Sequence, residues 1–161
     1  MATKDYSSKQ ESMVAKYLGW KTVVGSGARD FHYGDLIDLE WLGECKTHMK
    51  KQDRIVFYKK HWEKLPEEAM FHHKNPVLIV DDGTQRINKT YCLFINRFDT
   101  VGDAEEFGVI VPVEYSDSDV NIRLDADKLD DTILYSVRKF DPNFKLYICS
   151  ISKFKDMLEN G

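Results

Sequence analysis

Asp35, Glu44 and Lys46 stand close together in the chain, within residues 34–46. Glu44 and Lys46 are two residues apart in a stretch predicted to be a β-strand, so both side chains should leave the same face of that strand. Asp35 opens the preceding strand and can meet them across a tight hairpin. Mg²⁺ prefers carboxylate oxygens as ligands, and the lysine adds a positive charge. The spacing predicts a metal-assisted centre for the hydrolysis of phosphodiester bonds.

This chemistry gives each residue type a task. Bound Mg²⁺ lowers the pKa of a coordinated water and offsets charge on the phosphate oxygens, and fixed charges of this kind usually supply the largest catalytic effect. Lys46 would orient the attacking water or stabilise the developing charge. Asp38 competes for the aspartate role, but its offset of three residues from Asp35 places it on the opposite strand face. The non-catalytic alternatives are turn chemistry at Asp35 and a surface pair of Glu44 with Lys46.

The first apolar repeat of the chain predicts a helix that carries Glu11. Ser8-Lys9-Gln10-Glu11 matches a capping box ahead of the apolar positions at residues 13, 14, 17 and 18, and Gly19 is a natural stop. The capping box alone would explain a glutamate three residues after Ser8. The alternative is that Glu11 faces the metal, and the spacing leaves both explanations open.

A set of short motifs resembles the PD-(D/E)xK nuclease superfamily: Glu11 on a first helix, then Gly34-Asp35, then Glu44-Cys45-Lys46. Within that superfamily, the order of elements over roughly residues 7–82 is most similar to Holliday-junction resolvases of the archaeal and phage type. Gly34 takes the place of the proline that often precedes the aspartate. Gln52 is followed four residues later by Val56, which does not fit the Gln-x-x-x-Tyr motif of RecB-type exonucleases.

The resemblance implies a role for each matched residue. Asp35 and Glu44 would bind Mg²⁺, for which Mn²⁺ should substitute, and the backbone carbonyl of Cys45 would be a further ligand. Glu11 would lie near the metal as a fourth member of that ligand set. Ser26 matches a loop serine close to the DNA backbone. The catalytic set implied in this way is Glu11, Ser26, Asp35, Glu44 and Lys46. The resemblance also implies a homodimer that places two such centres across a four-way DNA junction.

The hydrophobic pattern predicts an α/β fold with a mixed central β-sheet flanked by helices. The resemblance adds a restriction-endonuclease-like core. Residues 1–161 should form a single nuclease domain, with the core at about 7–98 and an elaborated C-terminal part at 99–161. Helices are expected at 8–18, Ile55–Phe71 (with a break at Pro66), Asp130–Val137 and Ser152–Leu158. Strands are expected at Trp20–Val24, Asp35–Trp41, Leu42–Thr47, Pro76–Val80, Tyr91–Asn96, Val109–Tyr115, Val120–Leu124 and Phe144–Cys149.

The net charge of −4 hides an uneven distribution along the chain. Residues 1–98 carry a net charge of +3, whereas residues 99–131 carry −9. A dense basic run follows the Glu-x-Lys strand, and local positive charge supplies most non-specific affinity for nucleic acid. A solvated helix face would look similar. The candidate DNA-binding residues are Arg29, Lys50, Lys51, Arg54, Lys59 and Lys60.

The cysteines and the lengths of the apolar runs bear on the compartment of the protein and on its relation to membranes. Cys45, Cys92 and Cys149 are scattered without metal-binding spacing, which favours buried, reduced thiols in a cytoplasm, or in a host-cell cytoplasm if the protein is phage-encoded. No apolar run approaches the roughly 20 residues that span a bilayer, so no membrane association is expected.

The leading hypothesis is a Mg²⁺-dependent endonuclease that hydrolyses branched DNA as a Holliday-junction resolvase. The alternatives are a restriction-like or nicking nuclease of the same superfamily, and a non-catalytic DNA-binding protein that keeps the fold.

Overall fold

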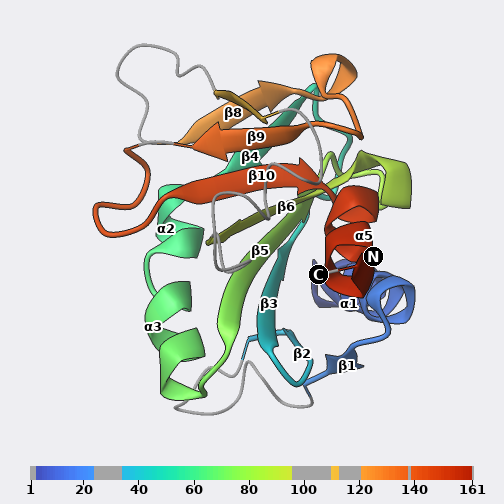
Figure 1. Cartoon of the computed structure of the whole chain (residues 1–161). Helices are drawn as coiled ribbons and strands as arrows, with labels where there is room; N and C mark the ends of the chain where they lie inside the picture. The colour runs from blue at the N-terminus through green and yellow to red at the C-terminus, as the bar shows by residue number, and fades with distance from the viewer. Residues whose placement is uncertain (1–2, 24–33, 96–109, 113–120, 138, 161) are drawn as a thin grey trace.

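The computed structural model describes residues 3–23, 34–95, 110–112, 121–137 and 139–160 (Figure 1). The helices are α1 (Thr3–Leu18), α2 (Lys59–Trp62), α3 (Leu65–Phe71) and α5 (Ile151–Asn160), with short 3₁₀ turns at Ile87–Lys89 and Ala126–Lys128. The strands are β1 (Lys21–Thr22), β2 (Leu36–Ile37), β3 (Trp41–Lys46), β4 (Arg54–Phe57), β5 (Asn75–Asp81), β6 (Thr90–Ile95), β7 (Ile110–Pro112), β8 (Ile122–Asp125), β9 (Leu134–Val137) and β10 (Leu146–Ser150).

A mixed β-sheet with the strand order β1-β2-β3-β5-β6-β10-β9-β7 forms the centre of the molecule. The β2–β3 hairpin is antiparallel, β3 and β5 are parallel, and β5, β6, β10 and β9 continue antiparallel. Helices α1, α3 and α5 pack against this sheet, while β4 and β8 pair separately beside it. The predicted α/β class with a mixed sheet flanked by helices is therefore confirmed.

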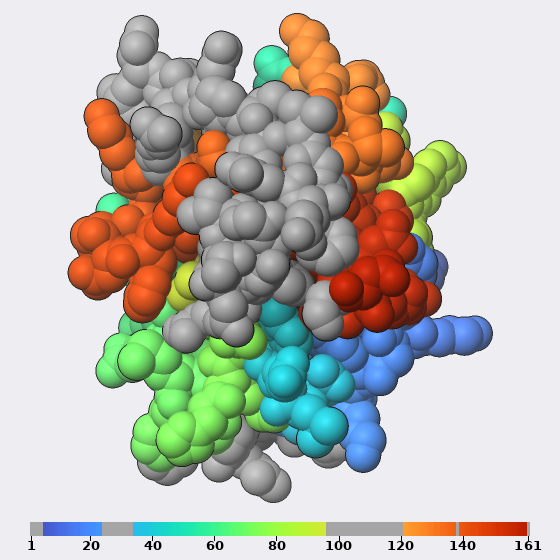
Figure 2. Space-filling model, in the orientation of Figure 1, coloured from blue at the N-terminus to red at the C-terminus, as the bar shows by residue number. Residues whose placement is uncertain are grey.

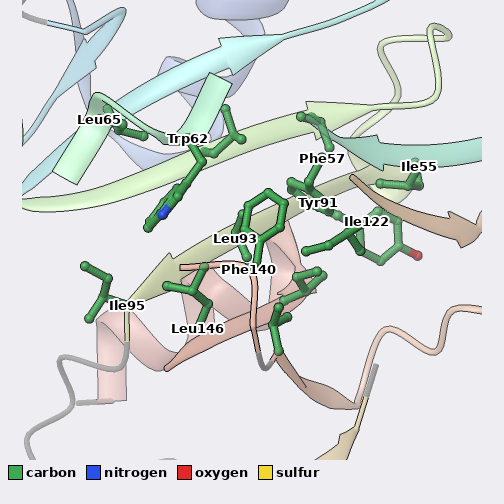
Figure 3. Close-up of a cluster of buried hydrophobic side chains, with 14 of the residues drawn as sticks. Ile55, Phe57, Trp62, Leu65, Tyr91, Leu93, Ile95, Ile122, Phe140 and Leu146 are labelled. Atoms are coloured by element: carbon green, nitrogen blue, oxygen red, sulfur yellow. The ribbon is translucent and has the colours of Figure 1, made fainter. Parts of the chain in front are cut away.

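The two faces of the sheet carry separate apolar cores because successive side chains on a strand point in opposite directions. One core contains Leu42 of β3 and is covered by α2, α3 and the β4–β8 pair; Figure 3 shows Phe57, Trp62 and Tyr91 packed within it. The other core contains Trp41 and Cys45 and is covered by α1 and α5. These two helices lie side by side (Figures 1 and 2). Between them, Lys155 Nζ lies 4.7 Å from the centre of the Tyr17 ring.

Three predicted segments differ from the structure. The first helix begins at Thr3 and not at Ser8, because contacts of Tyr6 with the turn after β5 hold its first turns in place. The predicted helix Ile55–Phe71 is wrong in its first part, where β4 pairs with β8 and buries three consecutive apolar residues. Two short helices follow, and the second begins at Leu65, next to the predicted break at Pro66.

The predicted helix Asp130–Val137 is also wrong. Asp130 accepts hydrogen bonds from the backbone and hydroxyl of Thr132 and thereby forms a turn, and β9 then pairs with β10. The strand predicted at Val109–Tyr115 is described only at Ile110–Pro112, and its remaining residues lie outside the described part of the chain. The other predicted strands are found near their expected positions, and no helix in the described ranges is long and apolar enough to cross a membrane.

Candidate active site

The β2–β3 hairpin places Asp35 and Glu44 on one face of the sheet. The backbone N–H of Asp35 donates to Gly43 O at 2.8 Å, and Leu36 pairs with Gly43 in the antiparallel register. Gly34 precedes the strand with a φ of +71°, and an added Cβ there would lie 2.9 Å from Gly43 O. Only glycine meets both conditions, so Gly34 fixes the start of the hairpin.

Asp35 and Glu44 form a close carboxyl pair. The Cys45 N–H donates to Asp35 Oδ2 at 2.8 Å, which orients the Asp35 carboxylate. Burial, together with the negative charge of Asp35, raises the pKa of Glu44 to about 8, and a hydrogen bond between the two carboxyls adds to this effect. At neutral pH Glu44 therefore keeps a proton and donates it to Asp35, because two carboxylates this close are not both ionised.

Lys46 supplies the positive charge beside this pair. Its Nζ lies 3.5 Å from Glu44 Oε1, and the two side chains leave the same face of β3, as the sequence predicts. The Lys46 side chain is 41% exposed and that of Glu44 is 22% exposed. The arrangement is thus open enough for a substrate to reach the ammonium group while the carboxyl is held partly out of water.

Helix α1 brings Glu11 to the same place. The neighbouring Gln10 is fully buried, and its Nε2 donates to Lys46 O at 2.8 Å, which fastens the helix to the end of β3. Burial and the charge of Asp35 raise the pKa of Glu11 to about 7, with Lys46 acting in the opposite direction. The capping-box explanation of Glu11 is wrong, since Ser8 lies inside the helix.

Four of the five predicted catalytic residues, Glu11, Asp35, Glu44 and Lys46, line one cavity of about 330 Å³. The sequence interpretation missed the other polar groups on its walls, above all His61 and Asp81. Burial and the nearby charges of Lys46, Lys60 and His48 lower the pKa of His61 to about 4, so its imidazole is neutral. The cavity is lined by Ser7, Glu11, Asp35, Glu44, Cys45, Lys46, Thr47, His48, Val56, Tyr58, His61, Val80 and Asp81.

A sequence signal existed for Asp81 but not for His61. Asp81 directly follows the buried run of β5, and polar residues at the carboxyl ends of parallel strands often face a ligand site. His61 lies in a short helix with no histidine or cysteine at metal-binding spacing, so nothing in the chain marked it.

The structure separates Asp38 and the basic residues from this cavity. Asp38 lines a different hollow, together with Trp20 and Trp41 on the other side of the sheet, which excludes it from the aspartate role. The basic run does not form one helix face: it is divided among a loop, β4 and α2. Arg54 pairs with Asp125 at 3.1 Å.

Of the remaining predicted DNA-binding residues, Lys51 and Lys59 line other hollows, Lys60 lies beside the cavity wall, and Arg29 is outside the described ranges. Lys50, Lys51 and Lys60 are exposed, and Lys59 is half-buried. Lys60 Nζ lies 5.6 Å from the centre of the Tyr58 ring, at the cavity wall. Ser26 and Arg29 fall in residues 24–33, outside the described part of the chain.

The side chains available as ligands limit the ways in which a metal ion could be held in the cavity. Within the described ranges, no three His, Cys, Asp or Glu side chains are close enough to hold one ion together, so Glu11 does not complete a three-carboxylate cage. Asp35 and Glu44 alone still suit Mg²⁺, which keeps several waters and uses one or two carboxylates. The proton that they share marks a place where a cation would relieve the repulsion between them.

Cys45 can contribute only its backbone. Its side chain is buried in the core under α1, where burial raises the thiol pKa far above its usual range.

Comparisons of the chain with protein-family models, with curated proteins and with solved structures find no match.

Proposed function

We propose that the protein is a Mg²⁺-dependent endonuclease whose centre is Asp35, Glu44 and Lys46, with Glu11 beside them. The observation that carries the proposal is the convergence of these residues, from α1, the β2 entrance and β3, on one cavity. A carboxyl pair that shares a proton next to an accessible ammonium suits an anionic substrate that arrives with a divalent cation.

The chain's own groups would divide the work of phosphodiester hydrolysis. Bound Mg²⁺ would lower the pKa of its water and neutralise phosphate oxygens. Lys46, which the carboxyl of Glu44 holds in place, would stabilise the negative charge that builds on the phosphate. Glu11, with a pKa of about 7, can accept a proton from the attacking water at neutral pH.

We further propose branched DNA as the substrate, a homodimer as the active species and a restriction-endonuclease-like core as the fold. The support is the resemblance of the motifs over residues 7–82, together with Lys46 in the cavity and the exposed Lys60 beside its wall. A dimer would place two centres on opposite arms of a four-way junction. DNA affinity should fall steeply with salt because lysine contacts release counterions from the phosphates.

The test is cleavage of an end-labelled four-way junction and a matched linear duplex in Mg²⁺. We expect the wild type to cut the junction, and Asp35→Asn and Glu44→Gln to lose on the order of 10²- to 10³-fold in rate. Asp38→Asn is the matched control, because it changes a carboxylate of the same hairpin on the other face of the sheet.

Each alternative gives a different result in this experiment. Equal cutting of junction and duplex would replace the junction-specific function with a general or restriction-like nuclease. Junction binding without cleavage would indicate a non-catalytic DNA-binding protein. Undiminished cutting by Asp35→Asn, or an equal loss in Asp38→Asn, would contradict the proposed centre. Sedimentation of the protein alone and with junction DNA tests the homodimer.

A further inference from the structure

A second group of buried oxygens lies where α1 meets the turn after β5. Gln10 Oε1, Asp81 Oδ2 and Gln85 Oε1 are shielded from solvent and have no hydrogen-bond partner among the described residues. The three residues are 0%, 1% and 7% exposed. Carboxylate and amide oxygens only accept hydrogen bonds, so such groups need a donor or a cation. We call these three residues the Asp81 cluster.

The end of β3 holds two members of the cluster. Gln10 Nε2 donates to Lys46 O at 2.8 Å, and Thr47 Oγ1, one residue further along, donates to Asp81 Oδ1 at 2.6 Å. Because these hydrogen bonds fix one polar atom of each side chain, the other oxygen of each is also held in place. Gln10 and Asp81 therefore contact two adjacent residues of the same strand end.

The first turns of α1 hold the third member. Gln85 Nε2 donates to Tyr6 O at 2.7 Å, and Tyr6 lies one helical turn before Gln10. The Tyr6 hydroxyl donates to Gly83 O, and the Gly83 N–H donates to Asp81 Oδ1 at 2.8 Å. Hydrogen bonds thus link Asp81 and Gln85 through Gly83 and Tyr6, and Gln10 is held by the residue that precedes Thr47, the partner of Asp81.

No described basic side chain forms an ion pair with Asp81. Lys46 pairs with Glu44, and Asp82 adds a second negative charge next to Asp81. Thr47 and Gly83 donate hydrogen bonds to Asp81 and His48 acts on its charge, but no ion pair with a described residue reaches this almost completely buried side chain. A buried carboxylate without a cation is costly.

Of the three residues, Asp81 lines the candidate active-site cavity, whereas Gln10 and Gln85 do not. Asp81 and Thr47 line the same cavity of about 330 Å³ as Glu44 and Lys46, together with Ser7 of α1. An ion that enters this cavity therefore meets the Asp81 side chain first. The donors are all oxygen atoms, from one carboxylate and two amides, and hard cations such as Ca²⁺ and Mg²⁺ take such ligands.

We propose that Asp81, Gln10 and Gln85 bind a hard divalent cation that fastens α1 to the ends of β3 and β5. This site is separate from the Asp35–Glu44 pair, and the inference does not depend on the proposed nuclease activity. The role of the ion is structural: it supplies the positive charge that the surrounding residues do not.

The test uses the full chain carrying Asp35→Asn and Glu44→Gln, which removes the two carboxylates that suit Mg²⁺ in the candidate active site. Protein treated with a chelator is titrated with Ca²⁺ and, separately, with Mg²⁺, while the melting temperature is followed; K⁺ at matched ionic strength is the control. We expect a rise of about 4 °C at a concentration tenfold above the dissociation constant. Calorimetric titration measures the binding directly.

Two additional substitutions decide the location of the ion. Asp81→Asn keeps an oxygen for Thr47 and Gly83, and it should abolish the response. Gln85→Glu adds a carboxylate, and it should lower the dissociation constant by roughly tenfold because ligand charge tunes affinity. Weaker binding in Gln85→Glu, an unchanged response in Asp81→Asn, or no response before these substitutions would overturn the proposal and indicate a buried water instead. If Asp81→Asn does not fold, the Gln85→Glu titration decides alone.

Discussion

The Asp35–Glu44 pair and the Asp81 cluster lie at the ends of the neighbouring strands β3 and β5, but they differ in exposure and in the charges around them. The Asp35–Glu44 pair is partly exposed, shares a proton and has Lys46 3.5 Å away. The Asp81 cluster is almost fully buried, has amide oxygens in place of a second carboxyl and has no basic partner in the described ranges. The first arrangement can exchange a proton and, under the proposed function, would also exchange a cation and a substrate. The second is suited to a resident ion that does not take part in a reaction.

Loss of the Lys46 charge should have the largest effect, and it should act on the Asp35–Glu44 pair and not on the Asp81 cluster. Under the proposed function, Lys46→Met keeps the aliphatic stem but loses the charge, and we expect cleavage of junction DNA to fall by on the order of 10²-fold. Lys50→Met is the matched control, because Lys50 is an exposed lysine that does not line the cavity. Equal losses in the two variants would show that Lys46 contributes only to general attraction of DNA.

The turn that supports the Asp81 cluster should be sensitive to added volume. Gly83 has a φ of +94°, and an added Cβ would overlap the backbone carbonyl of Lys50. We expect Gly83→Ala to lower the free energy of unfolding by roughly 3 kcal/mol in urea titrations and to remove the response to Ca²⁺. Gly19→Ala is the control: φ is +75° but no atom lies within 4 Å, so only about 1 kcal/mol should be lost. Equal losses would mean that the turn can shift freely.

The proton that Asp35 and Glu44 share predicts a pH dependence of the free energy of unfolding. Unfolded Glu44 is ionised above its ordinary pKa of 4.5, whereas folded Glu44 keeps its proton up to about pH 8. Folding therefore takes up a proton in this window, and the stability of the metal-free protein should fall by about 2 kcal/mol between pH 6.5 and 8. Urea titrations measure this fall.

Glu44→Gln is the control for that prediction: an amide does not titrate, so the slope should become shallower, and the slope that remains comes from Glu11, whose pKa of about 7 lies in the same window. His61 does not interfere: its lowered pKa changes stability only below pH 6.5. Saturating Mg²⁺ should remove most of the fall under the proposed function, since the cation replaces the proton. An unchanged slope in Glu44→Gln would contradict the shared proton.

The smallest expected effect concerns Ser8. Because α1 begins at Thr3, Ser8→Ala removes no helix cap and should change the free energy of unfolding by less than about 0.5 kcal/mol. A loss of about 1 kcal/mol, measured in the same titrations, would restore the capping box and would again explain Glu11 without the cavity.

Local pattern was sufficient to predict the hairpin that carries the Asp35–Glu44 pair. The two-residue spacing of Glu44 and Lys46 fixes their common face, and the offset of Asp38 correctly predicts the opposite one. The order of apolar runs also predicts the α/β class, because β5, β6 and β10 are short buried runs of that kind. The catalytic role of these residues stays a prediction.

Long-range contacts explain what the sequence could not predict. The apolar run Ile55–Phe57 has no strand partner nearby in the chain, and only its pairing with β8 makes it a strand. His61 enters the cavity because α2 follows that strand. The early start of α1 likewise depends on contacts of Tyr6 with residues 83 and 85.

The separation of the two groups along the chain has a consequence for the order of folding. Asp35, Glu44 and Lys46 lie within a single hairpin, so their assembly closes only a short loop and can occur early. The Asp81 cluster joins residue 10 to residues 81 and 85, and it forms only after β5 has returned parallel to β3 across the crossover through β4, α2 and α3. Because such non-local pairing is slow, we expect the hairpin to be native-like in the folding transition state and the junction of α1 with the turn after β5 to be among the last contacts made.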